Sequence, residues 1–255
     1  MTRRHIAFAC ENAQLVGTMD DASGKRGLLI VSGGNEIRSG AFSGQAKLAV
    51  RIAAAGWPVF RFDRRGIGDS EGENAGFRES GRDIAAAFAT FLVEQHGLER
   101  VVGFGNCDAA SALMMFGGAG CHSLVLANPW TFESDDPATM SPSAIRSRYA
   151  SKLKNPRELA RLVKGNVSAV KLARGLTQAL RPSSPPNTLS QQMRDGMASF
   201  EGTVSYLVAG RDRTGQAFAE SWDGALERLE GADHAFSSPE ASNWLYKRLL
   251  RALEE

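Results

Sequence analysis

The chain has 255 residues and a formal net charge of +2, because 30 lysines and arginines stand against 28 aspartates and glutamates. This length suits one large domain with a sizeable core. The content of 43% hydrophobic and 23% charged residues is typical of a globular protein and excludes extensive disorder. The near-balance of charge excludes a uniformly basic protein of the kind that binds nucleic acids.

The cysteines and the first residues indicate the compartment. Three cysteines, an odd and low number, argue against a disulfide framework. The amino-terminal segment lacks the apolar core of a signal peptide, and no run of about 18 apolar residues predicts a membrane-spanning helix. We therefore expect a cytoplasmic protein. Because no spacing typical of a metal site occurs, no metal or other cofactor is expected.

Six apolar runs of strand length recur along the chain, each bounded by glycine or polar residues. They are HIAFAC (5–10), GLLIVSG (27–33), WPVFRFD (57–63), RVVGFG (100–105), SLVLANP (123–129) and VSYLVAG (204–210). The later runs are continuously apolar, which is typical of parallel strands covered on both faces. Helical patterns lie between strands at 41–56 and 79–97, and another closes the chain at 242–253. This alternation predicts an α/β fold with a doubly wound, mostly parallel sheet.

One segment, residues 131–199, interrupts the alternation. It contains helical patterns but no convincing strand, and the linker-like stretch RPSSPPN lies near its end. The sequence therefore predicts a core formed by residues 1–130 and 200–255, with 131–199 inserted as a helical cap or lid. The alternative is a pair of packing helices without a gating role.

The most specific motif follows the strand RVVGF, where Gly105-Asn106-Cys107-Asp108-Ala109 leads into a helix of small residues. A nucleophile elbow requires this arrangement, because small residues two before and two after the nucleophile let the backbones approach closely. The usual pattern is G-x-S-x-G, so this chain has cysteine for serine and alanine for the last glycine. The helix N-terminus favours a thiolate at Cys107, and we expect the Asp108 N–H to face an oxyanion.

A cysteine nucleophile needs a base and a residue that orients the base. His234 lies in the loop GADHAF near the carboxyl terminus, and Asp212 lies in GRD, directly after an apolar strand. The order Cys107, Asp212, His234 matches the order of nucleophile, acid and base in the α/β-hydrolase pattern. Asp233 and Asp223 are alternative acids, but neither follows a predicted strand.

Each of these residues also has a structural interpretation. Cys107 could be a buried structural cysteine, the role we expect for Cys10 and Cys121. Asp212 could form a turn, and His234 could be a solvated loop residue. Three matches in the right order, each placed as the pattern requires, favour a catalytic triad.

The second oxyanion donor is expected in the glycine-rich loop after the early strand LLIVS. We favour the Gly34 N–H, with Asn35 as the alternative, because glycines let backbone N–H groups turn inward. Arg38 in this loop could hold a substrate carboxylate or phosphate, although a surface role is more common for an arginine. The later loop FDRRGIGDSEG has Glu71 where a dinucleotide fingerprint needs its third glycine, and no P-loop pattern occurs.

Taken together, DRRGIGDSEG, GNCDAAS, the late GRD and GADHAF resemble the α/β-hydrolase family across nearly the whole chain. More narrowly, GGNEIRSG and the C-D-A elbow are similar to the exosortase A system-associated hydrolases, found with exopolysaccharide and protein-sorting loci. The resemblance implies the α/β-hydrolase fold and an acyl-hydrolase-like site, without a firmly assigned substrate. Dienelactone hydrolases share the cysteine elbow but not the residues around it.

We therefore expect an acyl hydrolase that acts on an ester or thioester through a covalent acyl-Cys107 intermediate. An acyltransferase with the same site is one alternative, because a thioester intermediate can pass its acyl group to acceptors other than water. A binding or scaffold protein on the same fold is another. The expected partner is a small or carrier-bound acyl substrate, and neither the acyl chain nor the oligomeric state follows from the sequence.

The total charge conceals a local basic patch. Residues 141–181 hold ten lysines and arginines against one glutamate, a net charge of +9, so the chain total of +2 leaves −7 for the remainder. Arg157, Arg161 and Lys164 have the spacing of one helix face. The patch predicts attraction to an anionic substrate, carrier or lipid surface, and thus a peripheral membrane contact. The alternative is a solvated surface.

Overall fold

The computed structural model describes residues 2–133 and 188–255, and within these residues eight strands form one sheet. The strands are β1 (Arg3–Cys10), β2 (Ala13–Asp20), β3 (Arg26–Val31), β4 (Val59–Phe62), β5 (Arg100–Asn106), β6 (Ser123–Ala127), β7 (Thr203–Ala209) and β8 (Leu226–Leu229). Their order across the sheet is β1-β2-β4-β3-β5-β6-β7-β8. The pairs β1–β2 and β2–β4 are antiparallel and the others are parallel, which confirms the mostly parallel sheet.

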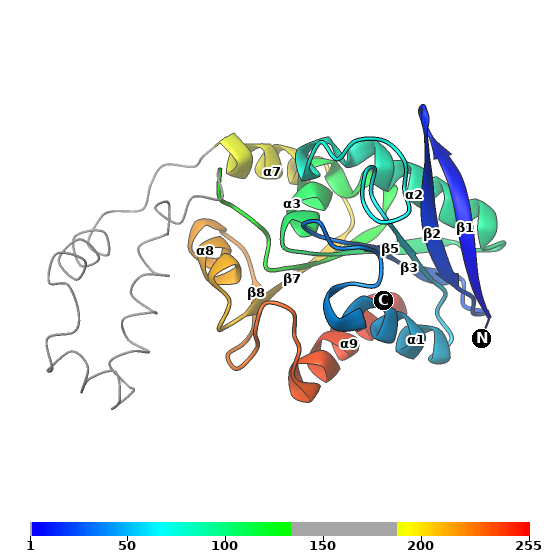
Figure 1. Cartoon of the computed structure of the whole chain (residues 1–255). Coiled ribbons are helices and arrows are strands. Elements are labelled where there is room, and N and C mark those ends of the chain that lie inside the picture. Colours follow the sequence, from blue (N-terminus) through cyan, green and yellow to red (C-terminus); the bar gives the residue numbers. More distant parts are fainter. Residues whose placement is uncertain (1, 134–187) are drawn as a thin grey trace, which may run out of the picture.

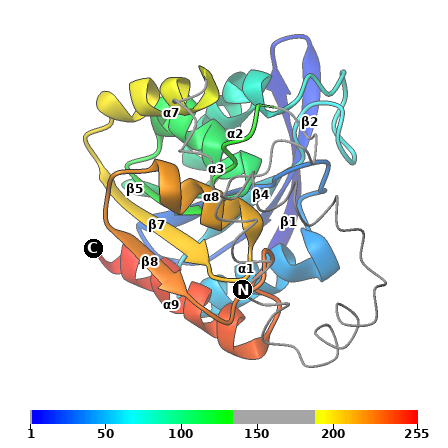
Figure 2. The ribbon, with the colours of Figure 1, turned by 90° about the vertical axis from the view of Figure 1, so that its left-hand side faces the viewer.

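Helices cover both faces of this sheet (Figures 1 and 2). One face carries α1 (Gly44–Ala54) and α9 (Pro239–Glu254), and the other carries α2 (Gly81–Glu94), α3 (Asp108–Met115), α7 (Thr188–Ala198) and α8 (Arg213–Ser221). Short 3₁₀ turns occupy Ala41–Ser43, Phe77–Glu79 and Gly117–Gly120. The predicted helices at 41–56, 79–97 and 242–253 are confirmed with shifts of a few residues at their ends.

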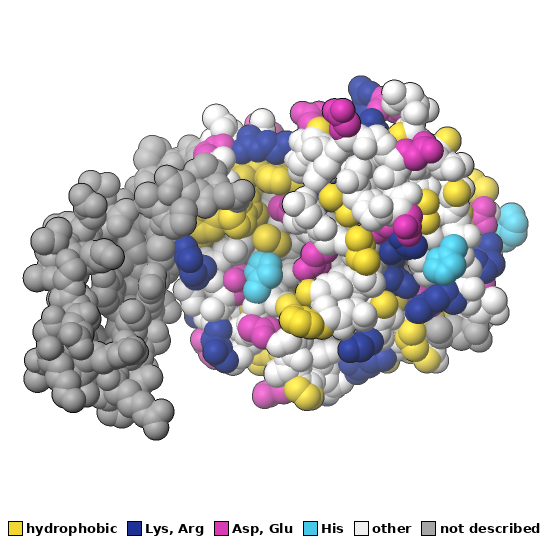
Figure 3. Space-filling view, in the orientation of Figure 1, with side chains coloured by type: hydrophobic (Ala, Val, Ile, Leu, Met, Phe, Trp, Pro, Cys, Tyr) yellow, Lys and Arg dark blue, Asp and Glu magenta, His cyan; other side chains and the backbone are white. Residues whose placement is uncertain are grey.

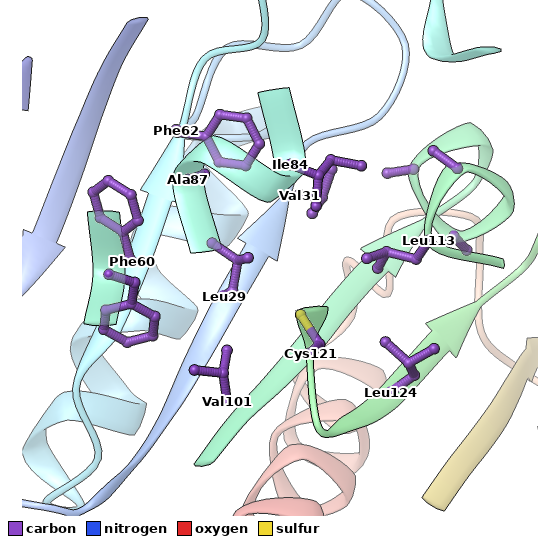
Figure 4. Packing of buried hydrophobic residues seen from close by; sticks show 14 of the residues in the cluster. Leu29, Val31, Phe60, Phe62, Ile84, Ala87, Val101, Leu113, Cys121 and Leu124 are labelled. Atoms are coloured by element: carbon purple, nitrogen blue, oxygen red, sulfur yellow. The ribbon is translucent and has the colours of Figure 1, made fainter. Parts of the chain in front are cut away.

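The core is divided by the sheet because successive strand residues point to opposite faces. On β3, Leu29 and Val31 face α2 and α3, whereas Leu28 and Ile30 face α1 and α9, and all four are fully buried. Figure 4 shows the hydrophobic cluster on the α2 and α3 side of the sheet, in which side chains of β3, β4 and β5 meet those of α2 and α3. Burial on both faces explains why these strands are continuously apolar in sequence.

Two edge-region strands, β2 and β8, were not predicted as strands. β2 follows β1 after a turn that contains Glu11 at φ +55°, and it pairs with β1 residue for residue. The sequence of β8 is LERL, whose two central charged residues weaken the apolar signal. Glu227 of β8 is nevertheless held by Arg248 and Arg251 of α9, so the charged pattern is satisfied by neighbouring cations. His234 therefore lies in the loop after β8, and not in a loop that follows β7 directly.

The predicted insertion and its basic patch lie mostly in residues 134–187, outside the described residues. The described chain on either side of this segment meets at Glu133. The Glu133 carboxylate accepts hydrogen bonds from the Thr188 hydroxyl at 2.6 Å and the Leu189 N–H at 2.9 Å, and pairs with Arg78 at 2.6 Å. These donors lower the pKa of Glu133. Helix α7 then packs on α3 and buries Leu189 and Met193.

The surface and the helices of the described part show two further features. Figure 3 shows side chains of both charges interspersed over the face seen in Figure 1, with hydrophobic side chains gathered below α7. Within residues 2–133 and 188–255, no helix combines the length and apolar character that a bilayer crossing requires.

Candidate active site

Three loops from the carboxyl edge of the sheet meet at one place. Because β5, β7 and β8 run parallel, their carboxyl ends lie at the same edge. Cys107 follows β5, Asp212 follows β7 within a few residues, and His234 lies in the loop after β8. The structure thus brings the three predicted triad residues together, although they are far apart in sequence.

The backbone at Cys107 forms a sharp strand-to-helix turn. Cys107 has φ +63° and ψ −129°. Non-glycine residues rarely adopt this strained conformation, and such residues are concentrated at functional sites. Gly105 is required beneath it, since a Cβ there would lie 2.7 Å from the Ala109 carbonyl carbon and the Ala110 nitrogen. Cys107 N–H donates to the Ala127 carbonyl at 3.0 Å, which ties the turn to β6. The turn presents the sulfur at the N-terminus of α3.

The three free cysteines lie in different surroundings. Cys107 is partly exposed, whereas Cys10 and Cys121 are buried, as expected for structural cysteines. Burial raises the pKa of Cys121 to about 12, and burial together with the nearby Asp83 raises the pKa of Cys10. Both buried thiols are therefore kept in the protonated, unreactive form at neutral pH.

His234 is held between Asp212 and Cys107. Its Nδ1 lies 3.0 Å from Asp212 Oδ1, and its side chain also hydrogen-bonds to Cys107. Asp212 is nearly buried and is itself fixed as the N-cap of α8, where Oδ2 accepts the Gly215 N–H at 2.8 Å. One carboxylate oxygen thus anchors a helix while the other orients the imidazole.

The pKa of His234 reflects these neighbours. The hydrogen bond that His234 donates to Asp212, and then its hydrogen bond with Cys107, raise the pKa of His234 to about 10, against a smaller opposing effect of burial. The imidazolium form is therefore favoured at neutral pH. A proton that stays on the ring is available to a leaving group, which is the task of a general acid.

The alternative acids lie in other interactions. Asp233 accepts hydrogen bonds from the Ser237 N–H at 2.8 Å and from the Ser237 hydroxyl, which lower the pKa of Asp233. Asp223 is 96% exposed and lies 3.5 Å from Arg194. Neither carboxylate has the contact with His234 that Asp212 makes.

Two asparagines hold the His234 loop in place, and neither was predicted from the sequence. Asn106 Nδ2 donates to the His234 carbonyl at 3.0 Å, and Asn128 Nδ2 donates to Asn106 Oδ1 at 3.0 Å. Asn128 is fully buried at φ +44°, and its Oδ1 accepts the Ala209 N–H at 2.8 Å. This chain of bonds links the ends of β5, β6 and β7 to the histidine. The only sequence signal for this role was the polar Asn128 directly after the apolar run SLVLA.

The expected oxyanion site is occupied by a side chain of the protein itself. The Gly34 N–H donates to Asp108 Oδ1 at 2.6 Å, and Arg64 Nη2 lies 3.7 Å from Asp108 Oδ2. Arg64 also donates to the Gly34 carbonyl. One of the two backbone donors predicted from the sequence, the Gly34 N–H, is therefore bonded to the side chain of the residue that supplies the other.

The other predicted residues of this loop serve the chain's own structure. Asn35 is exposed, and its Oδ1 accepts from Asn74 at 2.9 Å. Arg38 is not a surface arginine, because its guanidinium pairs with buried Asp63, with Asp69 at 2.9 Å, and with Thr18 at 3.0 Å. These bonds favour a role for Arg38 in holding the loop rather than in binding substrate.

Two hollows flank the site. One, of about 210 Å³, lies between the start of α1 and the His234 loop, and is lined by Phe104, Asn106, His234 and Phe236 among others. A larger one, of about 700 Å³, lies beside Arg64 at the start of α2 but contains neither Cys107 nor His234. Among the described residues, no group of three or more potential metal ligands occurs.

Comparisons with known proteins agree with this architecture. An esterase from Pyrococcus furiosus has a TM-score of 0.64 at 15% identity, with 99% of this chain and 91% of that chain covered. An alpha/beta hydrolase from Penicillium sp. sh18 has a TM-score of 0.63 at 16% identity, with 100% and 98% covered. A proline iminopeptidase from Mycobacterium smegmatis has a TM-score of 0.59 at 14% identity, with 98% of both chains covered. At such identities the likeness shows the fold alone.

Comparison of the sequence identifies the family of the chain but no individual relative. No curated protein sequence matches the chain significantly. The profile of the alpha/beta hydrolase family, in contrast, matches residues 28–243, which include the elbow, Asp212 and His234. The chain therefore belongs to the alpha/beta hydrolase family and is a hydrolase.

Proposed function

We propose that the protein is a cysteine-dependent acyl hydrolase that cleaves esters or thioesters through an acyl-Cys107 intermediate. The observation that carries this proposal is the continuous set of contacts from Cys107 to His234 to Asp212. It joins a nucleophile on a strained turn to a base whose ring is oriented by a buried carboxylate.

In the first half-reaction, His234 already carries the Cys107 proton as an imidazolium, and the negatively charged sulfur attacks the acyl carbon. A carbon–sulfur bond forms, the bond to the alcohol or thiol breaks, and His234 gives its proton to that leaving group. In the second half-reaction, water gives a proton to His234 and its oxygen to the acyl carbon. The carbon–sulfur bond then breaks, the acid leaves, and the proton stays on His234 beside the negatively charged sulfur.

The charge that develops on the carbonyl oxygen needs backbone donors. The Asp108 N–H, at the start of α3, and the Gly34 N–H are the two candidates, as in other enzymes that use an elbow. Removing one such donor typically costs about 10²- to 10³-fold in rate. The Gly34 N–H becomes available only when the Asp108 carboxylate leaves it.

The hollow beside His234 suggests the size of one substrate group. Cys107 is not among its lining residues, but its volume of about 210 Å³ and the lining side chains Leu48, Phe104, Phe236 and Leu245 suit a short apolar part of a substrate that reaches past His234. Within the family we further propose the exosortase A system-associated group, on the strings GNCDAAS and GGNEIRSG. Location of the gene beside exopolysaccharide or sorting genes tests that grouping.

The test is hydrolysis of p-nitrophenyl esters and acyl thioesters with chains of increasing length. We expect turnover that prefers short chains, and its loss in Cys107→Ala. The matched control is Cys121→Ala, which removes a buried thiol remote from His234 and is expected to keep the activity. Unchanged turnover in Cys107→Ala contradicts the proposal, and absence of turnover in every substrate favours a binding protein on this fold.

A further inference from the structure

The residue that follows the nucleophile has its side chain in an unusual place. Asp108 Oδ1 lies 2.6 Å from the Gly34 nitrogen, on the N–H that a hydrolysis intermediate needs. A Cβ at Gly33 would lie 2.6 Å from the same oxygen and 2.7 Å from the Asn106 carbonyl oxygen, so the approach leaves no room for a side chain there. A carboxylate oxygen and an oxyanion both carry negative charge and accept hydrogen bonds. The Asp108 carboxylate thus accepts the hydrogen bond that the Gly34 N–H would otherwise donate to an oxyanion.

Arg64 holds this carboxylate from the other side. It is 4% exposed, its Nη2 donates to the Gly34 carbonyl, and the same nitrogen lies 3.7 Å from Asp108 Oδ2. Its second terminal nitrogen, Nη1, is buried and has no hydrogen-bond partner among the described residues. The guanidinium therefore attracts Asp108 through Nη2, and its Nη1 is an unused donor in the part of the chain that the structure describes.

We propose that Asp108 forms an autoinhibitory contact, as an internal competitor that must leave the Gly34 N–H before an oxyanion can use it. This inference rests on the proposed function, because it assigns the Gly34 N–H to the intermediate on Cys107. A neutral ester carbonyl is a weaker acceptor than a carboxylate, so it does not displace Asp108 before the reaction begins. Small neutral esters should therefore react slowly with the wild-type enzyme.

The size of the effect follows from the population of the open state. When a site is competent in only a fraction of molecules, the apparent rate is the full rate multiplied by that fraction. Hydrogen bonds to charged groups are among the stronger ones in proteins. We therefore expect the closed arrangement to slow acylation by about ten- to one hundredfold. A structural fastening between the two loops predicts the opposite sign, because its loss would disorder the elbow and slow the reaction.

The experiment measures the burst of p-nitrophenolate from p-nitrophenyl acetate, which reports acylation, in the wild type and two variants. Asp108→Ala should be about ten- to one hundredfold faster. Asp108→Asn should be faster by less, since its amide oxygen still accepts from Gly34 but lacks the charge. The control is Asp21→Asn, which removes a carboxylate from a remote pair with Arg4 and should match the wild type. Equal or slower acylation in both Asp108 variants overturns the inference.

A second measurement separates competition from a general change in the site. A trifluoromethyl ketone adds to a thiol to give a hemithioketal that carries the oxyanion, so its affinity reports that donor directly. We expect the affinity to increase in Asp108→Ala by the same factor as the burst rate, with KM for the ester little changed. If affinity and KM shift together, the competitor role is wrong. Absence of any acyl group on Cys107 in all variants instead contradicts the proposed function itself.

Discussion

Cys107 and Cys121 lie at opposite edges of the sheet, and the same side chain has different chemistry at each. Cys107 follows β5 at the carboxyl edge, with a positive φ and His234 in contact. Cys121 precedes β6 at the amino edge and is buried in the core with Leu113 and Leu124 (Figure 4). Burial raises the pKa of Cys121 to about 12. The turn and its neighbours, rather than the residue type, therefore make a thiol reactive.

The largest expected effect separates the two thiols. Cys107→Ala should lower kcat/KM by about 10⁴-fold or more, because removal of a nucleophile disables the whole triad. Cys121→Ala should change kcat/KM by less than about threefold, since that thiol only fills the core. Steady-state hydrolysis of one short ester measures both. A large loss in Cys121→Ala alone would reverse the comparison.

The next largest effect concerns the His234–Asp212 pair, which lies beside Cys107 and not beside Cys121. Asp212→Asn should lower kcat/KM by about 10²- to 10⁴-fold, because His234 loses its orienting carboxylate. The control is Asp223→Asn, which removes a 96% exposed carboxylate and should leave activity unchanged. If Asp223→Asn or Asp233→Asn has the larger effect, Asp212 is not the acid of the triad.

The same variant has a pH signature. Asp212 is the largest contribution that raises the pKa of His234 to about 10, so its neutralisation should lower that pKa. Activity that depends on the imidazolium is lost as pH rises through the His234 pKa. The alkaline limb of the profile of kcat/KM against pH should therefore move to lower pH in Asp212→Asn. An unmoved alkaline limb would show that His234 does not control it.

Two glycines of β5 allow a matched test of the backbone. A Cβ at Gly105 would lie 2.7 Å from backbone atoms of α3, which cannot yield. Gly105→Ala should therefore lower activity by about tenfold or more and stability by about 1–3 kcal/mol. A Cβ at Gly103 would instead lie 2.9 Å from the Cys121 sulfur and from Leu124 Cδ2, which are side-chain atoms.

Gly103→Ala should thus cost stability but little activity. Adding Cys121→Ala makes room for the new methyl group, so the double variant should recover part of the loss, about 1 kcal/mol. Urea unfolding measures the free energies, and ester hydrolysis measures the activities. Equal losses of activity in the two glycine variants would show that the elbow has no special requirement at Gly105.

The smallest effect is on stability alone. The folded-state pKa of His234 is raised from 6.5 to about 10, so its protonation stabilises the folded state. This contribution is complete below pH 6.5 and is lost as pH rises toward about 10. The free energy of unfolding should therefore fall more between pH 7 and pH 10 in the wild type than in His234→Gln. Parallel curves would mean that the folded-state pKa is not raised.

Much of the fold was predictable because buried parallel strands carry their own signal. The apolar runs predicted β3 to β7 and the elbow, and strand ends predicted which loops meet. β8 was missed because LERL depends on arginines of α9 for its charge balance, a contact that sequence does not display. The side-chain hydrogen bonds of Asp108, Asn106 and Asn128 were not predicted either. Their roles come from hydrogen bonds across 22 to 128 residues of sequence.

The most direct test of the central claim is mass spectrometry of the protein after brief reaction with p-nitrophenyl butyrate and acid quenching. We expect one added butyryl group, mapped by proteolysis to the peptide that contains Cys107. The mass should be unchanged in Cys107→Ala and modified as in the wild type in Cys121→Ala. A butyryl group on another residue, or one that persists in Cys107→Ala, would contradict the account.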